Sequence, residues 1–244
     1  MRAFFAAIRF LTVLPVPRSW AEGEGVLERS VPFFPLVGVI IGAAAAGLAA
    51  GLVHVLPPAP SAVVLVLALI AASGALHLDG LADTADGFLS SRPKQKVLEI
   101  MRDSASGAMG VLAISGILLM KVACFVSLPP EHWWRFALIV PVAGRGAVVL
   151  SMSLLRYARP SGLGTAFYEK THGFALLISM TVLAAVAWGC LRMPGLLAAA
   201  VSVMTVLVFC GWCQRHIGGS TGDTLGAACE IAEAGCLLAL SALV

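Results

Sequence analysis

The chain has 244 residues, of which 59% are hydrophobic and only 12% are charged. An average soluble domain carries about 25% charged residues, so a soluble fold could not cover this much apolar surface. The formal net charge of +3 is small and the basic residues are scattered through short loops, which excludes nucleic acid as a partner. We therefore expect an integral membrane protein in contact with membrane lipid.

The first apolar segment, residues 3–14, is short, contains Arg9 and is not followed by a small-residue cleavage site. It indicates an N-terminal interfacial helix and not a cleaved signal peptide. Longer apolar runs then recur at the length that a membrane-crossing helix needs, about 20 residues for a hydrocarbon core of roughly 30 Å. They predict a single all-α domain over residues 1–244, a polytopic membrane helix bundle with about seven (six to eight) transmembrane helices. The expected spans are residues 32–54, 61–77, 107–128, 136–155, 174–191, 195–212 and 224–243.

The distribution of basic residues predicts how the chain is oriented. With the N-terminus in the cytoplasm, Arg135 and Arg192 are the only Lys or Arg residues in the opposite loops, so the positive-inside rule is obeyed. Acidic residues contribute little to orientation, yet they divide in the same way, with Glu131 alone on the outer side. We expect nearly all of the polar chemistry on the cytoplasmic face.

The first acidic motif is His77-Leu-Asp79-Gly-Leu-Ala-Asp83-Thr-Ala-Asp86-Gly87. Its three aspartates are spaced i, i+4 and i+7, so a helix would carry them on one face, where they repel unless a cation lies between them. Mg²⁺ is the simplest such cation, because it binds carboxylates and keeps positions for water and phosphate oxygens. The alternative is a solvated acidic loop. His77 is either a ligand or base, or a hydrogen-bonded histidine at a helix end.

A second motif, Arg102-Asp103-Ser104-Ala-Ser-Gly107-Ala-Met-Gly110, precedes an expected span. Its small residues let backbone N–H groups approach an anion at a helix N-terminus, and Arg102 adds positive charge. Asp103 could join a metal site. A plain helix cap explains the serine and aspartate residues equally well.

The third motif, Gly218-Gly-Ser220-Thr221-Gly-Asp223, lies before the last span, on which Glu230 follows seven residues after Asp223. The two acids share a helix face, and the hydroxyls and glycines again precede a helix N-terminus. The motif is no Walker loop, because Gly-Lys-Ser/Thr is missing. Two such clusters on one side of the membrane predict a shared site.

Arg145 lies inside an expected span between two glycines, where facing lipid would be expensive. We expect it to point into the bundle, either paired with an acid or in contact with a substrate phosphate. Lys121 also falls within a span, and the sequence assigns it no role.

These motifs resemble the cobalamin synthase family, the adenosylcobinamide-GDP ribazoletransferases of bacterial and archaeal membranes. The resemblance is collinear and covers most of the chain, and the acidic string at residues 77–87 is its most specific part. A departure follows Asp103, where Ser-Ala-Ser replaces the family's pattern. The other matching segments are residues 9–17, 32–38, 102–104, 157–159, 162–164 and 218–223.

The resemblance implies the last assembly step of cobalamin synthesis. A hydroxyl of α-ribazole, or of its 5′-phosphate, would attack the cobinamide-side phosphorus of adenosylcobinamide-GDP, releasing GMP and forming adenosylcobalamin or its 5′-phosphate. It further implies a magnesium-dependent transferase in the bacterial cytoplasmic (inner) membrane, with its N-terminus and active site on the cytoplasmic side. A homo-oligomer, or a complex with other enzymes of cobalamin biosynthesis, is left open.

The family match also implies roles for individual residues. A proton acceptor for the attacking hydroxyl would be one of Asp83, Asp86 and His77. Mg²⁺ would be held by Asp79, Asp83 and Asp86, with Asp223, Asp103 and Glu230 completing or facing the site. The expected substrate contacts are Arg102, Ser104, Arg145, Arg159, Ser220 and Thr221.

Two other classes compete with this interpretation. CDP-alcohol phosphotransferases also place aspartates at a cytoplasmic membrane face, but Asp83-Thr84 stands where their Ala-Arg is required, and no Gly-x3-Asp-x3-Asp follows. A cation transporter could hold acids inside a helical bundle. However, the acidic segments here are expected at an interface and not at the membrane midplane.

Overall fold

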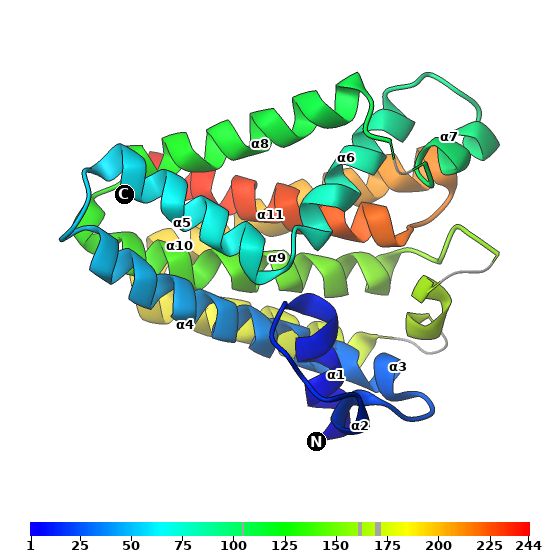
Figure 1. The fold of residues 1–244 in the computed structure, drawn as a ribbon, viewed down its shortest axis with the longest axis horizontal. Helices are drawn as coiled ribbons and strands as arrows, with labels where there is room; N and C mark the ends of the chain where they lie inside the picture. Colours follow the sequence, from blue (N-terminus) through cyan, green and yellow to red (C-terminus); the bar gives the residue numbers. More distant parts are fainter. Residues whose placement is uncertain (104, 161–162, 169–171) are drawn as a thin grey trace.

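The computed structural model describes residues 1–103, 105–160, 163–168 and 172–244 (Figure 1). Within these residues the fold is helical and contains no strand, which confirms the expected all-α class. The elements are α1 (Arg2–Leu11), α2 (Arg18–Ala21), α3 (Val26–Ser30), η1 (Val31–Phe33), α4 (Phe34–Leu52), α5 (Pro58–Ala72), α6 (Leu76–Phe88), α7 (Lys94–Ile100), α8 (Ala108–Ser127), η2 (Pro130–His132), α9 (Trp133–Leu154), η3 (Leu163–Phe167), α10 (Gly173–Ile217) and α11 (Gly222–Leu243).

Helix α9 forms the centre of the bundle, with α4, α10 and α11 packed around it. It is buried along most of its length because it is apolar on every side, as expected of a core helix. Glycines allow α4 to approach it closely: a β-carbon at Gly38 would lie 2.8 Å from the carbonyl oxygen of Pro141, and one at Gly42 would lie 2.5 Å from that of Leu138. Such small residues are typical of helix contacts in membranes.

Five helical stretches are long and apolar enough to cross a membrane, which confirms a polytopic membrane protein. They are Val26–Leu52, Ala108–Ser127, Pro130–Leu154, Gly173–Ile217 and Gly222–Leu243. Helices α5 and α6 would make a sixth span if they were counted together, although they are bent by 90° relative to each other. The count of seven therefore stays a prediction.

Helix α10 contains both of the segments that we expected as spans 174–191 and 195–212. It is broken at Arg192, whose φ of 53° and ψ of −129° are not helical. A β-carbon at Gly195 would collide with the carbonyl oxygen of Ala187, although residues eight apart in a continuous helix are about 12 Å from each other. The chain therefore turns back sharply, and Figure 1 shows the first half beside α4 and the second beside α11.

The break between α5 and α6 positions the acidic motif. Gly74 and Ala75 both have positive φ values, 61° and 59°, which end α5 and redirect the chain by 90°. Helix α6 is only 13 residues long and carries three aspartates, so it cannot cross a membrane alone. It runs toward the end of the bundle where α8 and α11 begin (Figure 1), and by itself it is not one of the stretches that could cross a membrane.

The expected helix at residues 3–14 is present as α1. It buries Ala7, Ile8 and Leu11 against the bundle and leaves Phe10 partly exposed. The short helices α2 and α3 pack beside it before the chain enters α4.

Candidate active site

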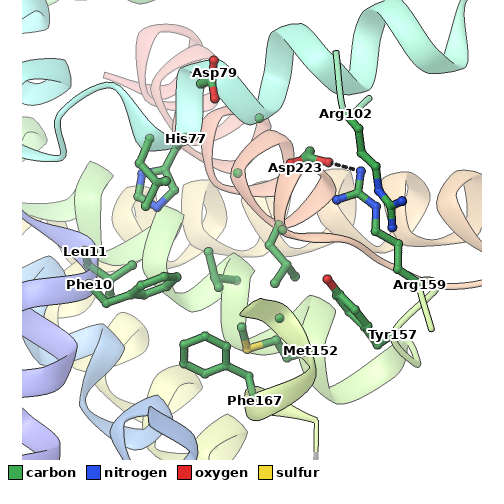
Figure 2. Close-up of a pocket in the computed structure, with 17 residues that line it drawn as sticks. Phe10, Leu11, His77, Asp79, Arg102, Met152, Tyr157, Arg159, Phe167 and Asp223 are labelled. Atoms are coloured by element: carbon green, nitrogen blue, oxygen red, sulfur yellow. Dashed lines mark hydrogen bonds and ion pairs between the residues drawn. The ribbon is translucent and has the colours of Figure 1, made fainter. Parts of the chain in front are cut away.

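A cavity of about 530 Å³ opens between α1, α6, α9, η3 and the beginning of α11 (Figure 2). One part of its wall is apolar, while charged side chains gather on another part. The apolar lining comes from Phe10, Leu11, Leu76, Val148, Met152, Phe167 and Leu225. The polar lining comes from His77, Asp79, Arg102, Tyr157, Arg159 and Asp223. A pocket of this size and mixed character is suited to a small-molecule ligand.

Two glycines bring the first and third motifs together. A β-carbon at Gly80 would lie 2.6 Å from the carbonyl oxygen of Asp223, and one at Gly226 would lie 3.0 Å from that of His77. Helices α6 and α11 therefore touch backbone to backbone. As a result, Asp79 and Asp223, 144 positions apart in the sequence (223 minus 79), line one cavity.

The segment before η3 adds a cation to the same site. Ala158 N–H donates to the Ser220 carbonyl at 2.8 Å and Ser220 N–H donates to the Arg156 carbonyl at 2.9 Å, so the two loops are held side by side. This pairing places the guanidinium of Arg159 2.8 Å from Oδ2 of Asp223 (Figure 2). Both side chains are mostly buried, with 12% and 21% exposed, so their charge-assisted hydrogen bond fixes the acid's direction.

The hydroxyls of the third motif are used inside the protein. Thr221 caps α11 and exchanges reciprocal hydrogen bonds with Thr224, the pattern of a capping box. The Ser220 hydroxyl lies 2.6 Å from that of Tyr168. Neither Ser220 nor Thr221 is among the described residues that line the cavity, and their expected contact with substrate stays a prediction.

The carboxylates that lie near the cavity repel one another. Burial, followed by the charges of Asp79, Asp223 and Asp86, raises the pKa of Asp83 to about 6. Arg159 opposes this shift but does not cancel it. Burial and the neighbouring carboxylates thus disfavour the charged form of Asp83, and a cation bound beside it would offset both effects.

Asp86 lies apart from this pocket because it caps a helix. Its Oδ2 accepts the N–H of Gly107 at 2.6 Å and its Oδ1 accepts that of Gly110 at 2.8 Å. Both carboxylate oxygens are thus committed to the first turn of α8, where an acid also favours the helix dipole. The structure therefore does not place Asp86 with the expected metal ligands, and it explains why α8 begins with small residues.

Glu230 and Arg145 also lie outside the cavity, in a buried ionic cluster of α8, α9 and α11. Lys121 donates to Glu230 and to Glu233, each at 2.7 Å, and Arg145 donates to Glu233 at 2.7 Å. Two cations and two acids balance in a region that water does not reach, which is how charges persist inside a membrane bundle. Of the two expectations for Arg145, pairing with an acid is confirmed.

Of the described residues in the second motif, Arg102 alone lines the cavity. Asp103 is exposed and its Oδ1 accepts the N–H of Ala105 at 3.1 Å, outside the cavity. Ser104, expected as a substrate contact, lies outside the described residues.

The described residues include no group of three or more His, Cys, Asp or Glu side chains that could hold a metal ion by themselves. Two carboxylates that line the cavity, those of Asp79 and Asp223, nevertheless fit one kind of magnesium site. Mg²⁺ commonly takes one or two carboxylates, keeps several waters and completes its shell with substrate phosphates. The acidic face, made up of Asp79 and Asp223 in the cavity wall and the neighbouring Asp83, lies beside Arg102 and Arg159 and has that character.

Most of the apolar wall was not foreseen from the sequence. Phe10 and Tyr157 fall in segments that match the family, so a signal was present for them. Met152 and Phe167 have no such signal, because ordinary apolar residues of a membrane protein do not reveal which of them line a cavity.

The fold and the cavity together define an integral membrane helix bundle with an acidic, arginine-flanked pocket at one end. Residues 3–241 match the family described as cobalamin-5-phosphate synthase, and the chain belongs to that family. It is 40% identical over 245 residues to the adenosylcobinamide-GDP ribazoletransferase of Klebsiella pneumoniae (strain 342), covering 98% of this chain and 99% of that protein. A protein of the same name from Roseiflexus sp. (strain RS-1) is 40% identical over 240 residues, covering 96% and 87%. No solved structure matches the chain.

Proposed function

We propose that this protein is an adenosylcobinamide-GDP ribazoletransferase. It joins α-ribazole, or its 5′-phosphate, to adenosylcobinamide-GDP, forming adenosylcobalamin or its 5′-phosphate and releasing GMP. The observation that carries the proposal is the meeting of Asp79, Asp223 and Arg159 in one cavity, in a chain that shares 40% identity with proteins of that name. The family match favours this reaction over the CDP-alcohol phosphotransferase and cation transporter alternatives.

The reaction is a phosphoryl transfer, so catalysis consists mainly of positioning and of balancing charge. A hydroxyl of the ribazole attacks the cobinamide-side phosphorus while the bond to the GMP phosphate breaks. Arg102 and Arg159 line the cavity and would bind the phosphate oxygens. One of the carboxylates on the acidic face would accept the proton of the attacking hydroxyl.

Magnesium dependence is part of the same proposal. Mg²⁺ held by Asp79, Asp83 and Asp223 would neutralise the pyrophosphate oxygens and the charge that develops on the leaving phosphate. Its support is the raised pKa of Asp83, which burial and the charges of Asp79, Asp223 and Asp86 cause, together with the position of Asp79 and Asp223 in the cavity wall. We propose no closed cage of protein ligands, since the substrate's own oxygens would complete the site.

The direct test is to incubate the purified protein in detergent with adenosylcobinamide-GDP, α-ribazole and Mg²⁺ and to separate the products by chromatography. We expect a cobalamin and GMP in equal amounts, and no product when a chelator replaces Mg²⁺. Restoration by added Mg²⁺ shows that the chelator acted on the metal. Absence of both products under all conditions would contradict the proposed function.

We further propose that the N-terminus and the cavity face the cytoplasm, in the bacterial inner membrane. The support is the positive-inside distribution of Lys and Arg. Single cysteines at positions 79 and 223 should react with a membrane-impermeant maleimide only after the inner membrane is permeabilised. Labelling of either position in intact spheroplasts would contradict this orientation.

A further inference from the structure

We infer that two cations beside the end of α10, Lys94 and Arg156, bind the phosphate headgroup of an anionic phospholipid. Neither residue is among the described residues that line the cavity. The inference goes beyond the proposed function, because it names a lipid partner and no substrate. It requires only that the bundle stands in a membrane, and it is therefore tested without the transferase reaction.

Lys94 and Arg156 come from different parts of the chain and meet at Gly218, where α10 ends and α7 lies beside it (Figure 1). A β-carbon at Gly218 would lie 3.2 Å from Nζ of Lys94 and 3.9 Å from Nη2 of Arg156. Both residues are exposed, and neither forms an ion pair with an acid among the described residues. Two positive charges thus converge on one point of the surface without a negative side chain to balance them.

The end of α10 accounts for only part of this convergence. A helix C-terminus carries the equivalent of about half a negative charge, and Arg156 uses its Nε to donate to the Gly218 carbonyl at 3.1 Å. The helix end therefore leaves more than one positive charge unbalanced, and Arg215 adds a further cation in the last turn of α10. An anion from outside the protein would balance this charge.

Arg156 is held in position before any ligand binds. Its carbonyl accepts the N–H of Ser220 at 2.9 Å and its Nε is committed to Gly218, so both its backbone and its side chain are fixed. Within the described part of the chain its two Nη groups have no hydrogen-bond partner, so they can donate to a ligand. A guanidinium fixed in this way binds phosphate oxygens at a smaller entropic cost than a mobile one.

Three segments place these cations at the boundary between lipid and water. In each segment an exposed apolar residue is followed two or three positions later by an exposed cation. The pairs are Leu89 with Arg92, Leu154 with Arg156, and Trp212 with Arg215. Tryptophan is typical of membrane–water interfaces, and basic residues between helices at this level are typical contacts of anionic headgroups.

This boundary favours a phospholipid over a soluble phosphate. Leu154 is 51% exposed at the end of α9 and Trp212 is 37% exposed near the end of α10, so both offer apolar surface beside the cations. One phospholipid can cover this apolar surface with its acyl chains while its phosphate contacts Lys94 and Arg156. A soluble phosphate gains only the second contact.

The test measures lipid binding to the purified protein in detergent. Native mass spectrometry with titrated phosphatidylglycerol counts the bound lipids, and phosphatidylcholine is the comparison because it carries a phosphate but no net charge. We expect phosphatidylglycerol to bind at least about tenfold more tightly. Lys94→Gln and Arg156→Gln should each weaken its binding about fivefold, the typical contribution of one cation to the attraction of anionic lipid.

Lys96→Gln is the matched control. Lys96 is exposed on the same helix as Lys94, so its replacement removes the same charge, but its Nζ is paired with Glu99 at 3.0 Å. We expect its affinity for phosphatidylglycerol to change less than about twofold. The three substituted positions are exposed, and thermal unfolding without lipid identifies any variant that fails to fold. If Arg156→Gln fails, Lys94→Gln carries the test.

Three results would overturn the inference. The first is equal affinity for the two lipids. The second is an equal loss of affinity in Lys96→Gln and Lys94→Gln, since the surface would then attract lipid only through its overall charge. The third is a rise in Tm with inorganic phosphate, at constant ionic strength, that equals the rise with phosphatidylglycerol and disappears in Lys94→Gln, which would assign the cations to a soluble phosphate. None of these measurements uses turnover, so the proposed function stands or falls separately.

Discussion

Gly80 and Asp223 meet through their backbones, so closely that a β-carbon at Gly80 would lie 2.6 Å from the carbonyl oxygen of Asp223. This contact joins α6 to the first turn of α11 and sets the separation of the acidic residues that each helix carries. The site therefore depends on a residue without a side chain, because the backbones of α6 and α11 touch at this position and leave no room for one.

Replacing Gly80 by alanine should push the two helices apart and lower kcat at least about tenfold, equivalent to roughly 1.4 kcal/mol of transition-state stabilisation. Steady-state turnover in detergent measures the effect. The matched control is Gly47→Ala, because a β-carbon at Gly47 in α4 would meet nothing within 4 Å. Equal activity of the two variants would show that the helix contact does not position the site.

Asp86→Ala should lower the thermal stability of the protein more than its turnover rate. The variant loses two hydrogen bonds to the N–H groups of Gly107 and Gly110, at the beginning of α8. Loss of a helix cap costs about 0.5–2 kcal/mol, so we expect a lower Tm in thermal unfolding. Activity that survives at low temperature would agree with a capping role. An unchanged Tm combined with complete loss of turnover would instead place Asp86 in the chemistry.

Glu233→Gln should destabilise the bundle strongly. It leaves Lys121 and Arg145, both buried, with only Glu230 as a negative partner. Breaking a buried ion pair by removing one partner costs about 3–5 kcal/mol. Denaturation in mixed micelles measures the difference, with Glu131→Gln at an exposed position as the control. If Glu233→Gln were as stable as the control, the ionic cluster would not depend on Glu233 for its contribution to stability.

Asp83 makes the stability of the metal-free protein depend on pH. Its pKa is raised from 3.8 to about 6, so between these values the folded protein keeps a proton that the unfolded chain has lost. This group therefore lowers the stability as pH rises from about 4 to about 6, and the penalty remains above that range. Asp83→Asn should remove this dependence when thermal unfolding is compared at pH 5 and pH 7.5 in a chelator. A pH profile identical to that of the unaltered protein would contradict the assignment.

Composition and hydropathy were sufficient to predict the membrane bundle, because apolar length alone determines which segments can cross. They could not locate the sharp turn at Arg192 or the 90° bend after Gly74, since both depend on backbone conformation that hydropathy does not record. The segment expected as residues 61–77 is shorter as a helix for that reason. The chain turns at Gly74 and begins α6 before His77.

The sequence placed Asp79 and Asp223 at one site, and both line one cavity, whereas Asp86 and Glu230 lie elsewhere; the metal and substrate roles of all four stay predictions. The helical spacing of Asp79 and Asp83 correctly indicated a shared face, but it gave Asp86 the same role. It could not reveal that the N–H groups of α8 would occupy both oxygens of Asp86. Seven-residue spacing likewise linked Asp223 with Glu230, although Lys121 holds Glu230 in the buried cluster instead. Spacing predicts the face of a helix, and the neighbouring helices decide what that face contacts.

The most direct test of the account is the rate of GMP release by Asp223→Asn, with adenosylcobinamide-GDP, α-ribazole and Mg²⁺ present. Asp223 is one of the carboxylates of the acidic face and pairs with Arg159. We therefore predict that the rate falls by at least about a hundredfold, or roughly 2.7 kcal/mol, in a protein that remains folded. Glu99→Gln, at an exposed carboxylate on α7, should retain the full rate. A normal rate of GMP release by folded Asp223→Asn would contradict the claim that this cavity is where the phosphoryl group is transferred.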